Sequence, residues 1–196
     1  TIVNLPLVTT FPYEQDFEGQ NYWSAGGTNS SWEVGVPSGT VITPNVSGQT
    51  SWVTSLGSSY NHNESSYIQG PCFDFSSLTD PFIEFDIWYH TDGNTDGAQV
   101  QVSVNGGAWE TVGQIVIPAP GDPIPWYNNA VSALGANEVG FTDNSNGWTT
   151  VTYSLTSYVG QSQLSFRVLF ASDGNNLGGN PATEQYYEGS LLIICT

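Results

Sequence analysis

A short polar segment carries acidic and amide side chains at every second position. Asp92, Asn94 and Asp96 occupy these positions, and Gly97 follows at once. In a tight loop this spacing turns alternate oxygens inward, and Ca²⁺ takes about six to eight such oxygen ligands. The distal glutamate of a helix-flanked calcium loop is absent, because Ser103 stands there. The segment predicts either a calcium-binding loop or a plain polar turn in which Asp-Gly supplies a positive φ.

The charge of the chain supports a divalent cation and excludes anionic partners. There are 18 acidic residues and a single cationic residue, Arg167, for a formal net charge of −17. Carboxylates at this density repel one another, and bound divalent cations relieve the repulsion. Nucleic acids and anionic membrane surfaces are held by lysine and arginine, so both are excluded as partners. Asp173, beside Gly174 and Asn175, is a second candidate calcium loop.

Residues 82–90 predict a strand with two unlike faces. The apolar face carries Ile83, Phe85, Ile87 and Tyr89, and the polar face carries Glu84, Asp86, Trp88 and His90. Because side chains alternate along a strand, the polar set forms a candidate ligand-binding face. Sugars stack on aromatic rings and hydrogen bond to carboxylates, so a glycan fits this set. Trp126 and Tyr127 are further candidates, although large aromatics are more commonly buried.

The same strand is also a candidate catalytic site. Glu84 and Asp86 are similar to the strand motif of jelly-roll glycosidases, E-x-D followed by a second glutamate, but Trp88 and Tyr89 stand where that glutamate belongs. Retaining hydrolysis needs two carboxyls about 5–5.5 Å apart on either side of the bond. G-x-S-x-G, H-E-x-x-H and P-loop motifs are also absent. The sequence therefore favours a non-catalytic protein.

Turn-forming residues divide the chain into short strands, which predicts an all-β fold. The 196 residues include 22 glycines and 11 prolines, and no apolar run is long enough to insert into a membrane. Strands are predicted at residues 82–90, 99–104, 109–117, 148–155, 164–170 and 191–194. Segments 22–62 and 118–147 are predicted as long loops. Arg167, on the polar face of its strand, is expected to pair with Glu84 or Asp86.

Five segments carry a family resemblance when they are taken in chain order. They are residues 12–18, 70–76, 96–107, 147–148 and 164–173. The set resembles the MAM-like jelly-roll domains of bacterial secreted surface proteins, including cleaved-adhesin-type modules and domains exported by the type IX secretion route. The resemblance implies a two-sheet antiparallel jelly-roll β-sandwich over residues 1–196. It also implies a non-catalytic domain that is commonly calcium-bound and appended to adhesins, proteases or glycoside hydrolases.

The resemblance further implies a metal site between an early Phe-Glu motif and the terminal strand. Asp16 and Glu18 are the early ligands in this interpretation. Acidic residues are expected in the terminal strand, where Ile193 and Ile194 stand instead. Glu188 would replace the missing ligand.

The two cysteines, Cys72 and Cys195, lie far apart and outside any Cys/His cluster, so a zinc site is disfavoured. In an extracellular protein they predict a disulfide, and two buried thiols are the alternative. In the resembled family the strand beginning near Cys72 lies beside the terminal strand, which would let the pair meet.

Together these features predict a calcium-stabilised, non-catalytic adhesion or binding module of a cell-surface or secreted multidomain protein, of which this chain is a segment. Its expected partner is a glycan or a surface protein, with neighbouring copies of itself as a further partner. One alternative is a repeat unit of an extracellular filament, suggested by the apolar run 191–194 near the end of the sequence. The other is a carbohydrate-binding module appended to a hydrolase. Sequons at Asn29, Asn45 and Asn63 would mark glycosylated loops in a eukaryotic protein and would mean little in a bacterial one.

Overall fold

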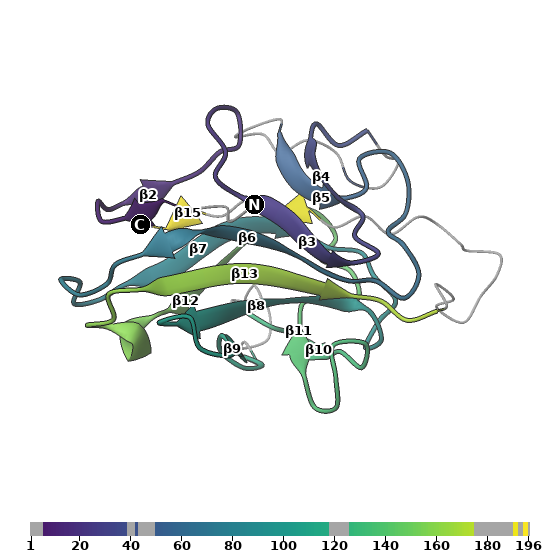
Figure 1. The fold of residues 1–196 in the computed structure, drawn as a ribbon. Helices are drawn as coiled ribbons and strands as arrows, with labels where there is room; N and C mark the ends of the chain where they lie inside the picture. Colours follow the sequence, from purple (N-terminus) through teal and green to yellow (C-terminus); the bar gives the residue numbers. More distant parts are fainter. Residues whose placement is uncertain are drawn as a thin grey trace.

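Two large β-sheets and a small two-stranded sheet contain the strands of the described residues (Figure 1). The computed structural model describes residues 6–38, 42, 50–117, 126–174, 190–191 and 194–195. The elements are β1 (Leu7–Val8), β2 (Tyr13–Glu14), β3 (Ser24–Thr28), β4 (Trp32–Gly35), β5 (Ser51–Thr54), β6 (Ser65–Phe73), β7 (Phe82–Trp88), β8 (Gly97–Val104), β9 (Trp109–Thr111), β10 (Asn129–Ala130), β11 (Val139–Gly140), β12 (Thr149–Ser154), the 3₁₀ helix η1 (Thr156–Tyr158), β13 (Leu164–Ala171), β14 (Ser190–Leu191) and β15 (Ile194–Cys195).

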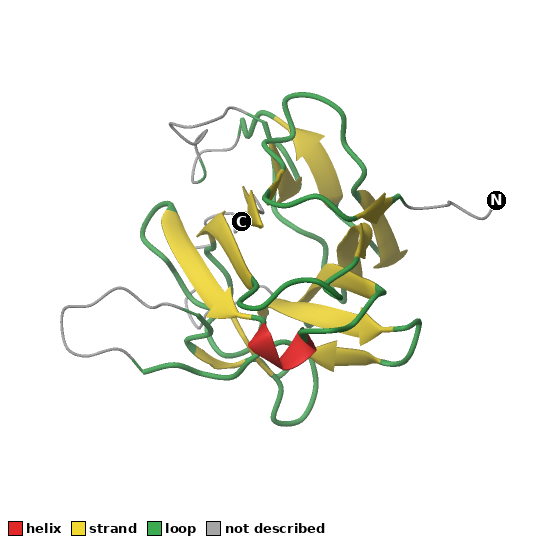
Figure 2. Ribbon diagram, turned by 90° about the vertical axis from the view of Figure 1, so that its left-hand side faces the viewer, coloured by secondary structure: helices red, strands yellow, loops and turns green. Residues whose placement is uncertain are grey.

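The predicted two-sheet antiparallel jelly roll is confirmed. One sheet has the order β1-β6-β13-β8-β9, with β3 also paired to β6; the other has the order β2-β15-β7-β14-β5-β4, with β12 paired to β7. Only β1, beside β6, is parallel among the described pairs. Figure 2 shows η1 in red among the strands and loops of the described residues. Within the described residues, no helix has the length and apolar character needed to cross a membrane.

Alternation along the strands places the core between the sheets. In β7, Ile83, Phe85 and Ile87 are buried and the residues between them are half-buried. In β13, Phe166 and Val168 are buried while Arg167 lies on the outer face. Each large apolar side chain removed from water in this way stabilises the fold by about 1.5–3 kcal/mol. The predicted inner and outer faces of both strands are confirmed.

Trp126 and Tyr127 belong to this core, so the prediction that they contact a ligand is wrong. Both are fully buried. Trp126 Nε1 donates to the Val112 carbonyl at 2.9 Å, and the Tyr127 hydroxyl accepts from the Val100 N–H at 2.8 Å and donates to the Val100 carbonyl at 3.0 Å. Backbone groups thus satisfy the polar atoms of both rings, and no polar edge is left for a ligand.

The predicted long loops contain strands. Segment 22–62 holds β3, β4 and β5, and β3 reads Ser-Ala-Gly-Gly-Thr, a composition without strand propensity. Its pairing with β6 decides its conformation. The described part of segment 118–147 contains the β10-β11 hairpin, and β9 ends at Thr111 rather than at residue 117.

Two residues of the apolar run 191–194, Leu191 and Ile194, lie in the sheet that contains β7. Leu191 pairs with both Trp52 and Ile87, and Ile194 pairs with Glu84 and Glu14. The backbone at Leu191 and Ile194 is therefore paired within the sheet. Residues 192 and 193 lie outside the described residues.

Cys72 has a free thiol, and its expected proximity to the terminal strand is wrong. Its Sγ lies 3.3 Å from Ser165 Oγ on β13. The neighbouring Phe73 is buried in the core, so alternation turns Cys72 to the outer face of the β6 sheet. Cys195 lies on β15, which belongs to the other sheet.

Arg167 pairs with an amide and two rings instead of the expected carboxylates. Its Nε donates to Gln101 Oε1 at 2.7 Å, and its guanidinium carbon lies 4.3 Å from the Trp109 ring centroid and 4.9 Å from that of Tyr67. Glu84 and Asp86 cannot reach it, because both face outward from the opposite sheet.

Candidate functional site: the β7 face and the acidic cluster

The predicted ligand-binding residues Glu84, Asp86 and Trp88 share the outer face of β7. All three are half-buried, and each alternates with a fully buried apolar residue. β7 lies within the seven-stranded sheet, paired to β12 on one side and to β14 and β15 on the other. This central position holds the three side chains on a regular and rigid backbone.

Hydroxyls from β12 orient the two carboxylates. Thr150 Oγ1 donates to Asp86 Oδ1 at 2.6 Å, and Thr152 Oγ1 donates to Glu84 Oε2 at 2.9 Å. Thr150 and Thr152 are also the direct cross-strand partners of Asp86 and Glu84. An ionised carboxylate has about four lone-pair positions, so one such bond fixes its direction and leaves it able to accept others.

An indole pair adjoins these carboxylates. The Trp88 and Trp148 rings meet edge to face, with centroids 6.2 Å apart and an interplanar angle of 75°. Trp148 directly precedes β12 and is half-buried. Trp148, Thr150 and Thr152 were missed as site residues. The alternation within segment 148–155 predicts a strand, but it does not reveal that this strand pairs with β7. We call Glu84, Asp86, Trp88, Trp148, Thr150 and Thr152 the β7 face.

His90 lies just beyond the end of β7 and is half-buried. It forms an isolated bridge with Asn144. Burial lowers the pKa of the His90 imidazole, and the charge of Asp143 opposes that effect. The imidazole is therefore neutral at pH 7 and adds no positive charge beside the β7 face.

The Asp92 loop forms a second feature, in which Asp96 is fully buried. The Tyr60 hydroxyl donates to Asp96 Oδ2 at 2.8 Å, and the Asp173 N–H donates to Asp96 Oδ1 at 2.8 Å. Burial raises the pKa of Asp96 to about 6, although these two hydrogen bonds favour its ionised form. Burial and Asp96 also raise the pKa of Tyr60 far above its ordinary value, so the phenol keeps its proton and acts as the donor.

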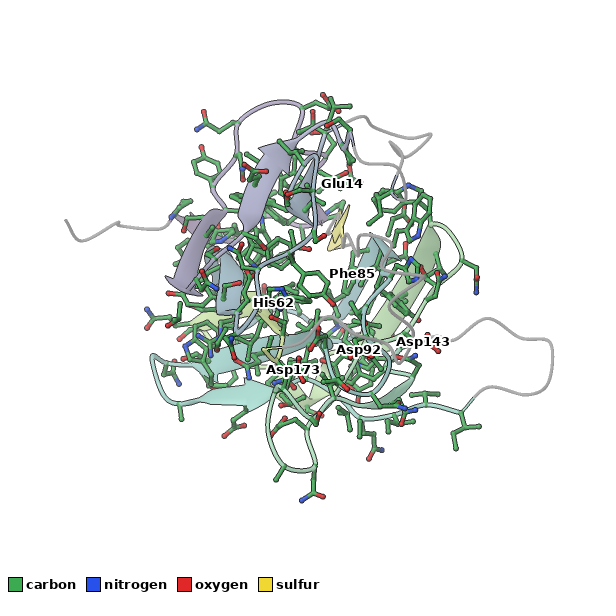
Figure 3. The ribbon with its side chains drawn as sticks, turned by 90° about the vertical axis from the view of Figure 1, so that its right-hand side faces the viewer. Glu14, His62, Phe85, Asp92, Asp143 and Asp173 are labelled. Atoms are coloured by element: carbon green, nitrogen blue, oxygen red, sulfur yellow. The ribbon has the colours of Figure 1, made fainter. Side chains whose placement is uncertain are left out.

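The two predicted calcium loops meet at this point. Burial, followed by the charge of Asp173, raises the pKa of Asp92. Figure 3 shows Asp92, Asp143 and Asp173 in the same part of the molecule, with Glu14 elsewhere. We call Asp92, Asp96 and Asp173 the acidic cluster. Among the described residues, no group of three or more His, Cys, Asp or Glu side chains is arranged to hold a metal ion.

The rest of the Asp92 loop is fixed by backbone contacts. Asn94 is exposed, has a positive φ of 63°, and donates its N–H to Thr142 Oγ1 at 3.0 Å. Gly97 is required for close approach, because a Cβ there would lie 2.5 Å from the Phe141 carbonyl oxygen. The alternative in which Asp-Gly supplies the positive φ is therefore wrong, since Asn94 supplies it.

Asp16 and Glu18 stabilise the turn after β2 through hydrogen bonds. Asp16 Oδ1 accepts the Glu18 N–H at 3.1 Å, and the Glu18 carboxylate accepts the Thr50 N–H at 2.6 Å and its hydroxyl at 3.0 Å. Both acidic residues are exposed. Glu188, the third residue of that implied metal site, lies outside the described residues.

Glu64 is a buried carboxylate that sequence reasoning missed. It accepts from the Ser31 N–H at 2.8 Å, the Ser31 hydroxyl at 2.6 Å, the Asn61 N–H at 3.2 Å and the Ser66 hydroxyl. Its own N–H donates to Ser172 Oγ at 3.0 Å. Ser172 precedes Asp173, so this network holds one part of the acidic cluster in place.

Solved structures with this fold include cleaved adhesin domains of Lys-gingipain. The K3 domain from Porphyromonas gingivalis W83 has a TM-score of 0.50 and 12% identity, covering 93% of this chain and 97% of that domain. The K2 domain of Lys-gingipain has a TM-score of 0.51, with the same identity and coverage.

One curated protein shares local sequence with this chain. Bacillopeptidase F of Bacillus subtilis (strain 168) is 32% identical over 108 residues, which is 53% of this chain and 7% of that protein. This chain therefore spans only a small part of that relative's length. No protein-family model matches the chain. The comparisons show that the chain has the fold of the cleaved adhesin domains.

Proposed function

We propose that this chain is a non-catalytic adhesion or binding module that holds a glycan on the β7 face. The observation that carries the proposal is the placement of Trp88 and Trp148 beside Glu84 and Asp86 on one outer face. Indole rings take the apolar face of a pyranose, and carboxylates accept hydrogen bonds from its hydroxyls. The hydroxyls of β12 preorganise both carboxylates for this task.

The same arrangement favours binding over hydrolysis. Glu84 and Asp86 are two residues apart on one strand, so both lie on the same side of any sugar that rests on the face. Glycoside hydrolysis needs carboxyls that flank the scissile bond. Among the described residues, a sugar bound to the β7 face would have no general acid on the side of the scissile bond opposite Glu84 and Asp86.

The setting we propose is extracellular, with residues 1–196 forming one MAM-like domain of a larger secreted or cell-surface protein that uses the type IX route. The cleaved adhesin fold supports the domain type. The match to a small part of bacillopeptidase F supports a place within a longer chain. A carbohydrate-binding module appended to a hydrolase would use the same face, and only its parent protein would differ.

Calcium stabilisation is part of the proposal. Asp92 and Asp96 belong to one loop and Asp173 approaches it from the end of β13, and the two loop carboxyls have raised pKa values because burial disfavours their charge. A divalent cation supplies the charge that such a cluster lacks. It would also relieve part of the net charge of −17.

The glycan proposal is tested by titrating neutral oligosaccharides, chosen from a glycan array, into three single variants. Trp88→Ala and Trp148→Ala should each weaken binding by about tenfold or more, since a buried ring contact is worth over 1 kcal/mol. Tyr22→Ala is the matched control, because Tyr22 is an exposed aromatic residue just before β3, outside the β7 sheet. Equal affinity in all three variants would refute the β7 face as the binding site.

A further inference from the structure

The outer face of the other sheet carries a second organised surface around Arg167. β13 lies between β6 and β8, and Arg167 pairs in register with Gln69 on one side and Gln101 on the other. Tyr67 precedes Gln69 by two residues on β6, and Trp109 lies at the start of β9. We call Tyr67, Gln69, Gln101, Trp109 and Arg167 the Arg167 face. Figure 1 shows its strands β6, β13 and β8 across the front of the molecule.

The guanidinium is fixed from three directions. Trp109 and Tyr67 contact it through their rings at 4.3 and 4.9 Å from the ring centroids, and Gln101 accepts its Nε–H at 2.7 Å. The Tyr67 ring is itself confined, because a Cβ on Gly26 of β3 would lie 2.7 Å from the Tyr67 hydroxyl oxygen. Arg167 therefore has one orientation before any ligand arrives.

The terminal nitrogens of Arg167 keep their bonding capacity. Within the described part of the chain, only its Nε–H takes part in a hydrogen bond and no carboxylate forms an ion pair with it. A guanidinium has five N–H donors in a planar fork that matches two oxygens of a carboxylate or sulfate. Among the described residues, the single cation of a chain with 18 acids thus has no acidic partner.

We propose that the Arg167 face is a second binding site, which takes an acidic sugar unit through its carboxylate or sulfate ester. The Arg167 Nη groups hold the oxyanion, the Gln69 amide bonds neighbouring hydroxyls, and the Trp109 and Tyr67 rings border the sugar. This site is independent of the proposed β7 face, since it lies on the other sheet and carries the opposite charge.

The acidity of the whole protein gives this site a distinctive salt dependence. Binding of a polyanion to a basic surface weakens as salt rises. In this protein the 18 acidic residues repel an acidic glycan at long range, while the half-buried Arg167 attracts it at short range. Salt screens distant charges more than close, partly buried ones. Affinity should therefore hold or increase between about 50 and 200 mM salt.

The test is calorimetric titration of the wild-type chain in EDTA, which removes metal bridging. The probes are an oligogalacturonate, its fully methyl-esterified neutral counterpart, and a sulfated galactan oligosaccharide. The oligogalacturonate, the sulfated probe or both should bind, and the esterified counterpart should not. Which acidic probe binds identifies the anion. Equal binding of the esterified probe, or binding of neither acidic probe, would overturn the proposal.

Variants separate this site from a purely structural role of Arg167. Arg167→Lys keeps the charge but loses the fork, and should weaken acidic-glycan binding by about tenfold. Trp88→Ala should leave that binding unchanged. Because a variant of Arg167 could also disturb the sheet, the Arg167 Nε and Nη signals of the wild-type protein are followed by NMR. They should shift on saturation with the acidic probe, and unmoved signals would contradict the site.

Discussion

The Tyr60 hydroxyl donates a hydrogen bond to Asp96 Oδ2 at 2.8 Å, and Asp96 is fully buried. The backbone carbonyl of Asp96 also accepts from the hydroxyls of Thr142 at 2.7 Å and Thr91 at 3.0 Å. Its second carboxylate oxygen accepts the N–H of Asp173. Asp96 therefore joins β8, the segment before β6 and the end of β13, and its ionisation affects the stability of the fold.

Replacing Asp96 by asparagine should remove a pH-dependent cost. Burial gives the Asp96 carboxyl a pKa of about 6 in the folded protein, against 3.8 for an aspartate in the unfolded chain. Between these values the folded protein keeps a proton that the unfolded chain has lost, so the free energy of unfolding falls as pH rises from about 4 to 6. Asp96→Asn should cancel this fall. The unfolding free energy of the variant, relative to that of the wild type, should therefore be ~1–2 kcal/mol higher at pH 7 than at pH 4, with solvent screening taken into account.

Urea denaturation of both proteins at pH 4, 5, 6 and 7 in EDTA measures this effect. The difference between their unfolding free energies is the quantity of interest, because carboxyls that do not interact with Asp96 contribute equally to both proteins. Asp143→Asn, at an exposed carboxylate near the same loop, is the control. A constant difference across the series would contradict the titration of Asp96 within this range.

Calcium should raise the melting temperature, and EDTA should lower it. An ion that binds only the folded state adds about 2.7 kcal/mol at a hundredfold excess over its dissociation constant. Mg²⁺ should be less effective because it demands tighter octahedral geometry. Asp92→Asn should abolish the response, and Asp16→Asn should not. If Asp16→Asn abolishes the response and Asp92→Asn does not, the ion binds at the turn after β2. If calcium does not change the melting temperature of the wild-type protein, calcium stabilisation is refuted.

Trp126→Ala should behave unlike the variants of the β7 face. Removing this fully buried ring should cost about 3–5 kcal/mol of stability through loss of packing and the resulting cavity. Well below its melting temperature the variant should bind neutral oligosaccharides as wild type does. Thermal denaturation and calorimetric titration measure the two properties, and a large loss of affinity in a folded Trp126→Ala sample would return this residue to the binding site.

Cys72→Ser should be close to neutral. The thiol is free and half-buried, and a serine hydroxyl could keep its polar contact with Ser165 Oγ, which lies at 3.3 Å. The expected change in unfolding free energy is within about 0.5 kcal/mol. Thiol labelling without reductant should modify Cys72, as peptide mass spectrometry would show. A Cys72 that stays unlabelled in the denatured, unreduced protein would contradict the free thiol.

The sequence alone predicts the class of fold and the faces of its clearest strands. Alternation in β7 and β13 has a period of two, and that period separates Phe85 from Asp86 and Phe166 from Arg167 without knowledge of any neighbour. Strands without such a pattern were missed. β3 contains two glycines, and its pairing with β6 holds it in the strand conformation. Its own composition therefore does not predict a strand.

The partners of these side chains were decided only by tertiary structure. Arg167 lies opposite Gln101 because β13 pairs with β8, and Asp86 meets Thr150 because β7 pairs with β12. Composition could not place Trp126 in the core and Trp88 on a surface, since both are equally apolar. Sheet order depends on contacts between residues distant in sequence, and the many alternative pairings of short strands have similar local energies. The sequence therefore determined which residues could bind, and the order of strands determined which of them stand together.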